Sequence, residues 1–399
     1  MNEFSSLLEK SHNFLLRRGM ERLREGLFDP FAVQLLTAGE TKLARAFEKG
    51  VTAVAKNEPA RLQICGSYGQ GKSHSLTWIR EHALQKGFVV SLINLDPREI
   101  PFHDFRQVYR ALMAAIRFPG SNDNLVQFWK TWSNDHQGAL DSIPDSMPHF
   151  FRSVLTALTS KNIPLTRKQK RLKKHSTFRP REFPWILANA LKGEQLPVFR
   201  LRHALKYRDV PFYKDASLVC KGWEPYLQAM YSFAELFQNM GFKGWVVLFD
   251  EGESIGQRPV NIRRKSYTIL DQIFVPARPV RGLYPIFAFT DEFFLQVQEE
   301  DYERVFTKQE QEFPYLEKNY GRSWQQIPRH HLHDLAAIDW QDIISKLIRL
   351  HAVAYGWQPQ EDEIRKQMQT ALKKAGTQEA RLKIKTLVAL LDIAQQKNV

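Results

Sequence analysis

Eight residues near the start of the chain have the types and spacing needed to hold a phosphate chain. Residues 66–73 read Gly-Ser-Tyr-Gly-Gln-Gly-Lys-Ser and fit the pattern G-x-x-x-x-G-K-[ST] without a mismatch. The glycines let backbone N–H groups turn inward around a β-phosphate, the lysine reaches the β and γ oxygens, and the Ser73 hydroxyl ligates Mg²⁺. The sequence therefore predicts a site for ATP and Mg²⁺ whose candidate nucleotide-binding residues are Gly66, Ser67, Tyr68, Gly69, Gln70, Gly71, Lys72, Ser73 and His74.

The local context of this motif is the one that phosphate binding requires. Residues 61–65 form a short strand-like run, and residues 73–83 have the pattern of a helix whose N-terminus would face the phosphates. A glycine-rich turn could match the motif by chance, but a chance match needs neither the strand nor the helix. We therefore favour the phosphate-binding interpretation.

Two adjacent carboxylates follow a second apolar run. Residues 244–251 read Gly-Trp-Val-Val-Leu-Phe-Asp-Glu, the form of a buried strand that ends in a Walker B element. Asp250 would hold Mg²⁺ through water, and Glu251 would polarise the attacking water. An apolar strand followed by acids is common in α/β proteins, so this assignment depends on the upstream motif. Glu253, close by, is expected to be a surface or supporting group.

The next predicted strand ends in a polar residue. Residues 281–290 form a largely apolar run that finishes at Thr290. In P-loop ATPases of the AAA+ type, a polar side chain at this place beside the Walker B strand contacts the γ-phosphate or the attacking water. Thr290 is therefore a candidate catalytic residue together with Glu251.

The elements around these motifs predict an α/β fold. A strand over residues 88–95 and a helix over 103–118 continue the first motif into a βαβ unit with a right-handed crossover. The expected architecture is an AAA+-like P-loop NTPase core with a parallel sheet, preceded by helices, interrupted by a basic helical lobe and followed by a helical lid. The predicted boundaries are 1–55 for the N-terminal helices, 56–335 for the core, about 119–225 for the insertion and 336–399 for the lid.

The charge of the chain indicates a polyanionic partner. The formal net charge is +14, and nine of the excess positive charges fall within residues 161–181, which contain no acidic residue. This tract is a candidate for contact with a DNA backbone, although a solvated loop that repels itself is the alternative. No helix-turn-helix, zinc-finger or RNP pattern indicates base reading. The candidate DNA contacts are Arg167, Lys168, Lys170, Arg171, Lys173 and Lys174.

Composition predicts a cytoplasmic protein. The chain is 43% hydrophobic, with 27 Phe and 9 Trp, which is enough apolar material for a large core. Cys65 ends the strand before the first motif and lies far from Cys220, so no disulfide is expected and a reducing compartment is indicated. No apolar run approaches the roughly 20 residues that span a bilayer, so no membrane partner is expected.

Several segments taken together resemble the ATP-binding proteins found with BREX and related bacterial phage-defence loci, often called BrxD, which are themselves similar to AAA+ ATPases. The tyrosine within the phosphate loop and the segment Leu-His-Ala-Val-Ala-Tyr-Gly-Trp are more distinctive than the Walker motifs. The resemblance implies an ATPase of a defence system that acts with a helicase-like partner from the same locus, and it does not extend to residues 122–212. The segments that carry it are 20–26, 36–40, 66–74, 87–91, 96–103, 108–113, 250–251, 282–285 and 350–357.

The resemblance also implies a role for Arg381. The family tends to end in a helix of the form P-R-x-x-L-R-x-L-V-x-x-L-D, which residues 380–392 follow, with Ala380, Ile384 and Lys385 in place of Pro, Leu and Arg. Arg381 would then be a lid arginine that touches the γ-phosphate and couples the angle of the lid to the nucleotide state. The alternative is an ordinary solvated arginine on a basic helix.

Two functional classes are open. In the first, the protein is an ATP-hydrolysing motor that engages DNA, with a DNA-loading regulator of replication or transposition as a variant. In the second, it is a nucleotide-dependent switch that assembles a complex. An arginine finger acting between subunits would favour a homo-oligomeric ring or filament, and its candidates are Arg278, Arg281, Arg304, Arg322 and Arg329.

Overall fold

The computed structural model describes residues 3–27, 29–38, 41–161, 179–194, 196–210, 218–306, 319–376 and 379–397. At the centre of this part of the chain is a five-stranded sheet in the order β2-β3-β4-β1-β5, in which every pair of neighbours is parallel. The predicted α/β class with a parallel sheet is confirmed. The strands are β1 (Leu62–Cys65), β2 (Val89–Asn94), β3 (Trp245–Asp250), β4 (Leu283–Phe289) and β5 (Arg329–His331).

The strand order decides which loops meet. Strand β4 lies between β1 and β3, with Ile286 paired to Leu62 on one side and to Leu248 on the other. The strand that leads to Thr290 is therefore next to the strand that ends at Asp250, as expected. Because parallel strands point the same way, the loops after β1, β3 and β4 converge at one edge of the sheet.

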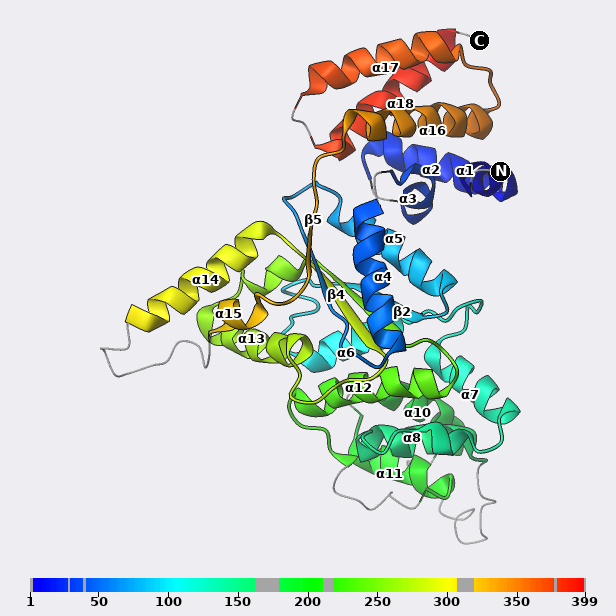
Figure 1. Ribbon diagram of the computed structural model, residues 1–399. Helices are drawn as coiled ribbons and strands as arrows, with labels where there is room; N and C mark the ends of the chain where they lie inside the picture. Colours follow the sequence, from blue (N-terminus) through cyan, green and yellow to red (C-terminus); the bar gives the residue numbers. More distant parts are fainter. Residues whose placement is uncertain are drawn as a thin grey trace.

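Helices cover both faces of the sheet because its side chains alternate between them. Val246 and Leu248 of β3 pack on the face covered by α4 (Thr41–Ala55) and α5 (Lys72–Gln85). Trp245, Val247 and Phe249 face the opposite side, where they join a core with α6 (Phe105–Ala114), α12 (Glu224–Asn239) and α13 (Val260–Phe274). The result is a three-layered arrangement around a sheet whose strands are buried on both faces (Figure 1).

A glycine sets the distance between α4 and the sheet. A Cβ atom at Gly50 would lie 2.1 Å from Cζ of Tyr284 on β4, so the helix can approach this closely only because the side chain is absent. The Tyr284 ring also stacks on Phe47, with 5.7 Å between the ring centroids.

In the described part of the chain between α6 and α12, helices pack beneath the sheet layer: α7 (Leu125–Asp135), α8 (His149–Thr159), α10 (Phe183–Leu191) and α11 (Val198–Tyr207) (Figure 1). Tyr109 of α6 joins them to the core, because its ring packs against Phe151 and its hydroxyl donates to the Leu191 carbonyl at 2.9 Å. All six predicted DNA contacts belong to residues 162–178 and lie outside the described residues.

The two ends of the chain share one hydrophobic core. Helices α1 (Glu3–Lys10), α2 (Asn13–Glu25) and α3 (Pro30–Leu36) pack with α16 (Ala337–Tyr355), α17 (Glu361–Ala375) and α18 (Ala380–Lys397). Figure 1 shows this group at the top, with both termini in it. Of the remaining helices, α14 (Asp291–Phe306) follows β4, and α15 (Tyr320–Trp324) packs against both α13 and α14.

No described helix is both long enough and apolar enough to cross a bilayer.

Candidate functional site

The glycine-rich loop connects β1 to the N-terminus of α5, as the sequence predicts. Gly69 and Gly71 have φ values of 80° and 100°, which side-chain-bearing residues rarely adopt. Helix α5 begins at Lys72, and no side chain caps its N-terminus. The first N–H groups of the helix are therefore left for another acceptor, and the N-terminal end of its dipole favours an anion.

Contacts inside the loop hold its shape. Gln70 Oε1 accepts a hydrogen bond from the Ser67 N–H at 2.7 Å, and a Cβ atom at Gly66 would lie 2.9 Å from the same oxygen. Tyr68 is 68% exposed, so its ring is free to meet a ligand or another surface. Ser73 lies one residue into α5 and is half-buried.

Lys72 is turned back onto its own loop. Its Nζ donates to the carbonyl oxygens of Gly66 at 3.1 Å and Ser67 at 3.3 Å, and it lies 3.4 Å from Oε1 of Glu253. The two side chains of this ion pair are only 9% and 13% exposed. The ammonium group is therefore held by loop carbonyls and one carboxylate, all of which phosphate oxygens could replace.

Glu253 belongs to the site rather than to the outer surface. In addition to the ion pair, its Oε2 is buried and has no hydrogen-bond partner among the described residues. Nothing in the sequence indicates that it pairs with Lys72, 181 positions earlier, because that contact depends on how β3 lies relative to β1. The sequence signal that could have placed Glu253 in the site was its position, three residues after Asp250.

The two acidic residues at the end of β3 differ in conformation. Asp250 is half-buried, and its Oδ1 accepts from the Glu251 N–H at 2.9 Å. Glu251 has a φ of 57°, a left-handed conformation that is uncommon for a residue with a side chain and that occurs often at functional sites. Burial raises the pKa of Glu251, and the negative charges of Glu253 and Asp250 raise it further.

Thr290 follows β4 directly. It is half-buried, and its carbonyl accepts from the Phe293 N–H at 3.3 Å where α14 begins. Because β4 separates β1 from β3, Thr290 lies at the sheet edge between the glycine-rich loop and the acidic residues. Its position agrees with the prediction, and its catalytic role stays a prediction.

His74 joins the start of α5 to the terminal helical group. Its Nε2 lies 3.0 Å from the Thr37 hydroxyl, just after α3, and burial lowers the pKa of His74 to about 4. The ring is therefore neutral near pH 7. It contacts a neighbouring element here, and direct nucleotide binding by His74 stays a prediction.

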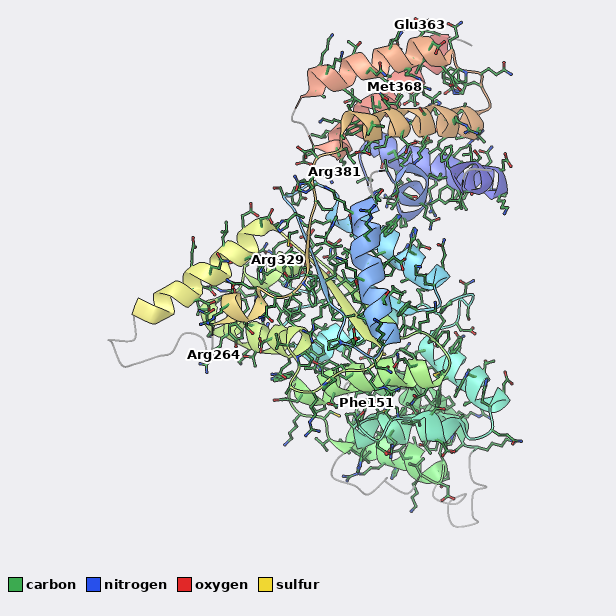
Figure 2. The ribbon with its side chains drawn as sticks, in the orientation of Figure 1. Phe151, Arg264, Arg329, Glu363, Met368 and Arg381 are labelled. Carbon is green, nitrogen blue, oxygen red and sulfur yellow. The ribbon has the colours of Figure 1, made fainter. Side chains whose placement is uncertain are left out.

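The start of α18 lies beside the same loop. A Cβ atom at Gly69 would lie 2.7 Å from Cδ of Glu379, and the Arg381 guanidinium lies 3.8 Å from Oε2 of Glu379. The aliphatic stem of Arg381 packs near Gly26. Figure 2 shows Arg381 on the side of the terminal helical group that faces the sheet. Arg381 is thus linked to the loop through Glu379, a residue that the sequence analysis did not single out.

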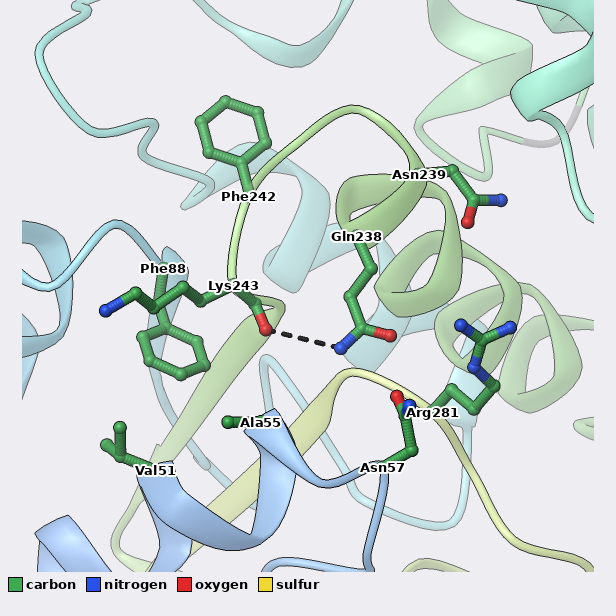
Figure 3. Close-up of a pocket in the computed structure, with 9 residues that line it drawn as sticks. All are labelled: Val51, Ala55, Asn57, Phe88, Gln238, Asn239, Phe242, Lys243 and Arg281. Atoms are coloured by element: carbon green, nitrogen blue, oxygen red, sulfur yellow. Dashed lines mark hydrogen bonds between the residues drawn. The ribbon is translucent and has the colours of Figure 1, made fainter.

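Two of the arginine-finger candidates precede β4 and so lie toward the sheet edge opposite the glycine-rich loop. Arg278 is exposed, and Arg281 pairs with Glu235 at 3.2 Å. Arg281 also lines a cavity of about 370 Å³ with Asn57 and Gln238, whose Nε2 donates to the Lys243 carbonyl (Figure 3). This cavity has no carboxylate among its lining residues and is not part of the candidate site.

The other candidates differ in how firmly they are held. Arg329 of β5 is fixed within the fold, since its Nε donates to Gln63 Oε1 at 2.9 Å and its guanidinium lies 4.1 Å from the ring centroid of Phe294. Arg322 is exposed. The side chain of Arg304 lies outside the described residues.

A group of metal-ligand residues also lies at the sheet edge. One ligand atom from each of Cys65, Asp291 and His331 lies within 4.8 Å of the other two. Burial raises the pKa of the Cys65 thiol to about 12, so the thiol stays protonated near neutral pH and is a weak ligand. We assign no metal to this group.

The fold places this chain in a class of protein: it is an α/β protein whose parallel sheet fits a P-loop-type core. A family model described as BREX system ATP-binding protein BrxC/D matches residues 17–145 and 221–399, which is more than half of the chain. The chain belongs to this family, and the resemblance read from the sequence is confirmed. No curated protein and no solved structure is similar enough to match the chain. The unmatched residues 146–220 include the basic tract.

Proposed function

We propose that this chain is an ATP-binding and ATP-hydrolysing AAA+-like P-loop protein of a BREX phage-defence system. The observation that carries the proposal is the glycine-rich loop at the uncapped N-terminus of α5, with Lys72 held 3.4 Å from a carboxylate that follows β3. The family, whose description names ATP binding, supports the choice of ligand.

The proposed roles follow from position. The loop amides and Lys72 bind the β- and γ-phosphates, and Ser73 and Asp250 are the residues that would hold Mg²⁺. The metal ion supplies positive charge against the phosphate oxygens. Glu251 accepts a proton from the attacking water, Thr290 orients the γ-phosphate or that water, and Arg381 reaches the γ-phosphate if Glu379 releases it.

DNA engagement is the second part of the proposal. The net charge of +14 and the basic tract within residues 161–181 support it, and the part of the chain that includes the tract is outside the family match. We further propose action in the cytoplasm with a helicase-like protein from the same locus, and assembly of several copies if an arginine finger is used.

A nucleotide-dependent switch is the alternative, and a specific observation favours it. Lys72 and Arg381 are both paired with acidic side chains, Glu253 and Glu379, around one loop. Phosphates that took over both cations would leave Glu253 and Glu379 without these partners, and Arg381 on a phosphate would change how α18 sits against the loop without any need for fast hydrolysis. A DNA-loading regulator of replication or transposition would combine this switch with DNA binding.

One measurement separates these functions. ATP hydrolysis by the purified protein is followed with and without double-stranded DNA, at low and at physiological salt, with Glu251→Gln as the blank. Stimulation by DNA that fades with salt supports the DNA-engaging ATPase. Slow hydrolysis that is indifferent to DNA supports the switch, and hydrolysis at the wild-type rate by the Gln variant removes Glu251 from its proposed role.

A further inference from the structure

A second cavity lies where the first turns of three helices meet. It has a volume of about 1010 Å³ and is lined from α6, from α13 and from the residues that lead into α12. Figure 1 shows these helices next to one another below the sheet, and Figure 2 marks Arg264 on α13. The residues of the glycine-rich loop are not among those that line it.

The charge of this cavity is positive. Among the described residues that line it, Arg106, Arg264 and Lys265 are cationic and Asp104 is the one carboxylate. His103 is also part of the wall. Burial lowers the pKa of His103, the positive charges of Arg258 and Lys265 lower it further, and the charge of Asp104 opposes them, so these two cations and one carboxylate lie around one imidazole. Like charges held together in this way attract a polyanion from solution.

Uncharged groups in the cavity wall could contact the parts of a nucleotide other than its phosphates. Trp223, just before α12, is half-buried and lines the cavity, and Asn261 and Thr268 add an amide and a hydroxyl from α13. The His103 Nδ1 is buried and has no hydrogen-bond partner among the described residues, so a ligand could supply one. An aromatic ring beside cations is the combination by which proteins bind nucleic-acid strands, because bases stack on the ring while phosphates meet the cations.

We propose that this cavity binds a single-stranded nucleic acid. A concave site of about 1010 Å³ is at the upper end of the range for ligand pockets and admits one strand, whereas a duplex carries its phosphates on a convex surface and hides its bases. The inference rests on the DNA engagement proposed above and assigns it to residues other than the basic tract. Phosphates contact Arg106, Arg264 and Lys265, and a base stacks on Trp223.

The test measures the binding of a fluorescein-labelled oligothymidine of about 12 nucleotides, within the usual range of single-strand site sizes. Anisotropy is recorded over a salt series for the full chain, for Arg264→Ser with Lys265→Ser, and for Trp223→Ala. The matched control, Lys373→Ser with Lys374→Ser, removes two exposed lysines of α17.

We expect the double substitution at Arg264 and Lys265 to weaken oligothymidine binding about tenfold and to lower the salt slope by about 1.4, the value for two phosphates. Trp223→Ala should weaken binding at least about fivefold with an unchanged slope.

Three results would overturn the proposal: no binding by the wild-type chain, equal loss in the cavity and control variants, or a duplex of the same length that depends equally on Arg264 and Lys265. ATP binding is measured on every variant. If a variant loses oligothymidine binding but keeps ATP binding, its fold is intact and the two sites are separate. If the wild-type chain fails to bind ATP, only the proposed nucleotide site is refuted. Lys265→Ser is the fallback variant, because this exposed lysine puts the fold at little risk.

Discussion

The ion pair between Lys72 and Glu253 is the contact that any bound phosphate has to replace. Its atoms lie 3.4 Å apart, and both side chains are mostly buried. A buried charge that loses its partner is costly, so Glu253 needs a new partner or a proton when Lys72 moves to a phosphate. In the proposed function, Glu253 therefore opposes nucleotide binding.

Replacement of Glu253 tests this opposition. We expect Glu253→Gln to bind ATP about three- to tenfold more tightly, the effect of removing a competing ion pair of modest strength. A fluorescent ATP analogue titrated into the protein measures the change. Glu99→Gln, an exposed residue in another loop, removes the same charge and should bind like the wild type. Weaker binding by Glu253→Gln would mean that the carboxylate helps to hold the nucleotide.

Substitutions of Lys72 and Glu251 should separate ATP binding from ATP turnover. Lys72→Ala removes the only ammonium group that reaches the loop carbonyls in the described structure, and should weaken ATP binding by about 100-fold or more. Glu251→Gln keeps the side-chain shape and should bind ATP but stop turnover. Calorimetric titration and phosphate release measure the two properties. ATP binding by Lys72→Ala at the wild-type level would contradict the proposed site.

The pH dependence of ATP turnover should reflect the ionisation of Glu251. Burial, then Glu253 and Asp250, raise the pKa of Glu251, so a base at this position loses activity as the pH falls through a value above the usual 4.5. Glu253→Gln removes one neighbouring negative charge and should move the acid limb of kcat to lower pH. A limb that stays in place would mean that another group limits the rate in acid.

At the scale of the elements, close packing of α4 on β4 depends on one missing side chain. Alanine is favoured over glycine inside an exposed helix by about 1 kcal/mol, so propensity alone predicts that Gly50→Ala is stabilising. The close packing predicts that the substitution is destabilising, because the new Cβ would lie 2.1 Å from Tyr284.

We expect Gly50→Ala to lower the free energy of unfolding by about 1–3 kcal/mol, the usual cost of overpacking. Urea denaturation measures it. Thr52→Ala, on the exposed side of the same helix, should change stability by less than about 0.5 kcal/mol. A stabilised Gly50→Ala protein would contradict the placement of α4 on the sheet.

At the scale of the whole molecule, a polar network joins the two ends of the chain. Asp392 of α18 accepts from Arg24 Nε and Nη2 of α2, both at 2.8 Å, and lies 3.0 Å from His351 Nε2 of α16. Trp357 Nε1 donates to His351 Nδ1 at 2.8 Å, so His351 carries its proton on Nε2 and donates a hydrogen bond to Asp392. This network ties together three helices whose apolar side chains share one core, and Arg17 Nε adds a further polar contact by donating to the Ala354 carbonyl at 2.8 Å.

The network should make stability depend on pH. Burial raises the pKa of Asp392, but the hydrogen bonds from Arg24 and His351 outweigh it and hold the pKa below its usual value. A lowered pKa in the folded state means that the carboxylate stabilises the protein above about pH 4, its unfolded pKa, and that this contribution is lost as the pH falls further.

We expect Asp392→Asn to lower the free energy of unfolding by about 1–3 kcal/mol at pH 7 and by less below pH 4. Thermal or urea unfolding at several pH values measures the difference. Glu363→Gln, an exposed acid of α17 marked in Figure 2, is the control and should change little. An equal loss at both pH values would mean that packing rather than charge accounts for the effect.

Sequence patterns predicted the elements that have strong periodicity. The strand after α13 was expected over residues 281–290 and is observed as Leu283–Phe289, because a continuous apolar run is a local property. Strand β5 was missed because it has three polar residues, and α17 because it buries only Ile364 and Met368. Strand β5 pairs with β1, which is remote in the chain, whereas α17 packs on its chain neighbours α16 and α18.

The sequence by itself determined the glycine-rich motif, the acidic end of β3, the α/β class and the family, because each is encoded in contiguous residues with fixed spacing. Only the tertiary structure decided that Glu253 meets Lys72, that Glu379 lies against Gly69, and that α2 packs with α18. Arg24 and Asp392 are 368 residues apart. Such contacts depend on the path of the whole chain, which local periodicity does not contain.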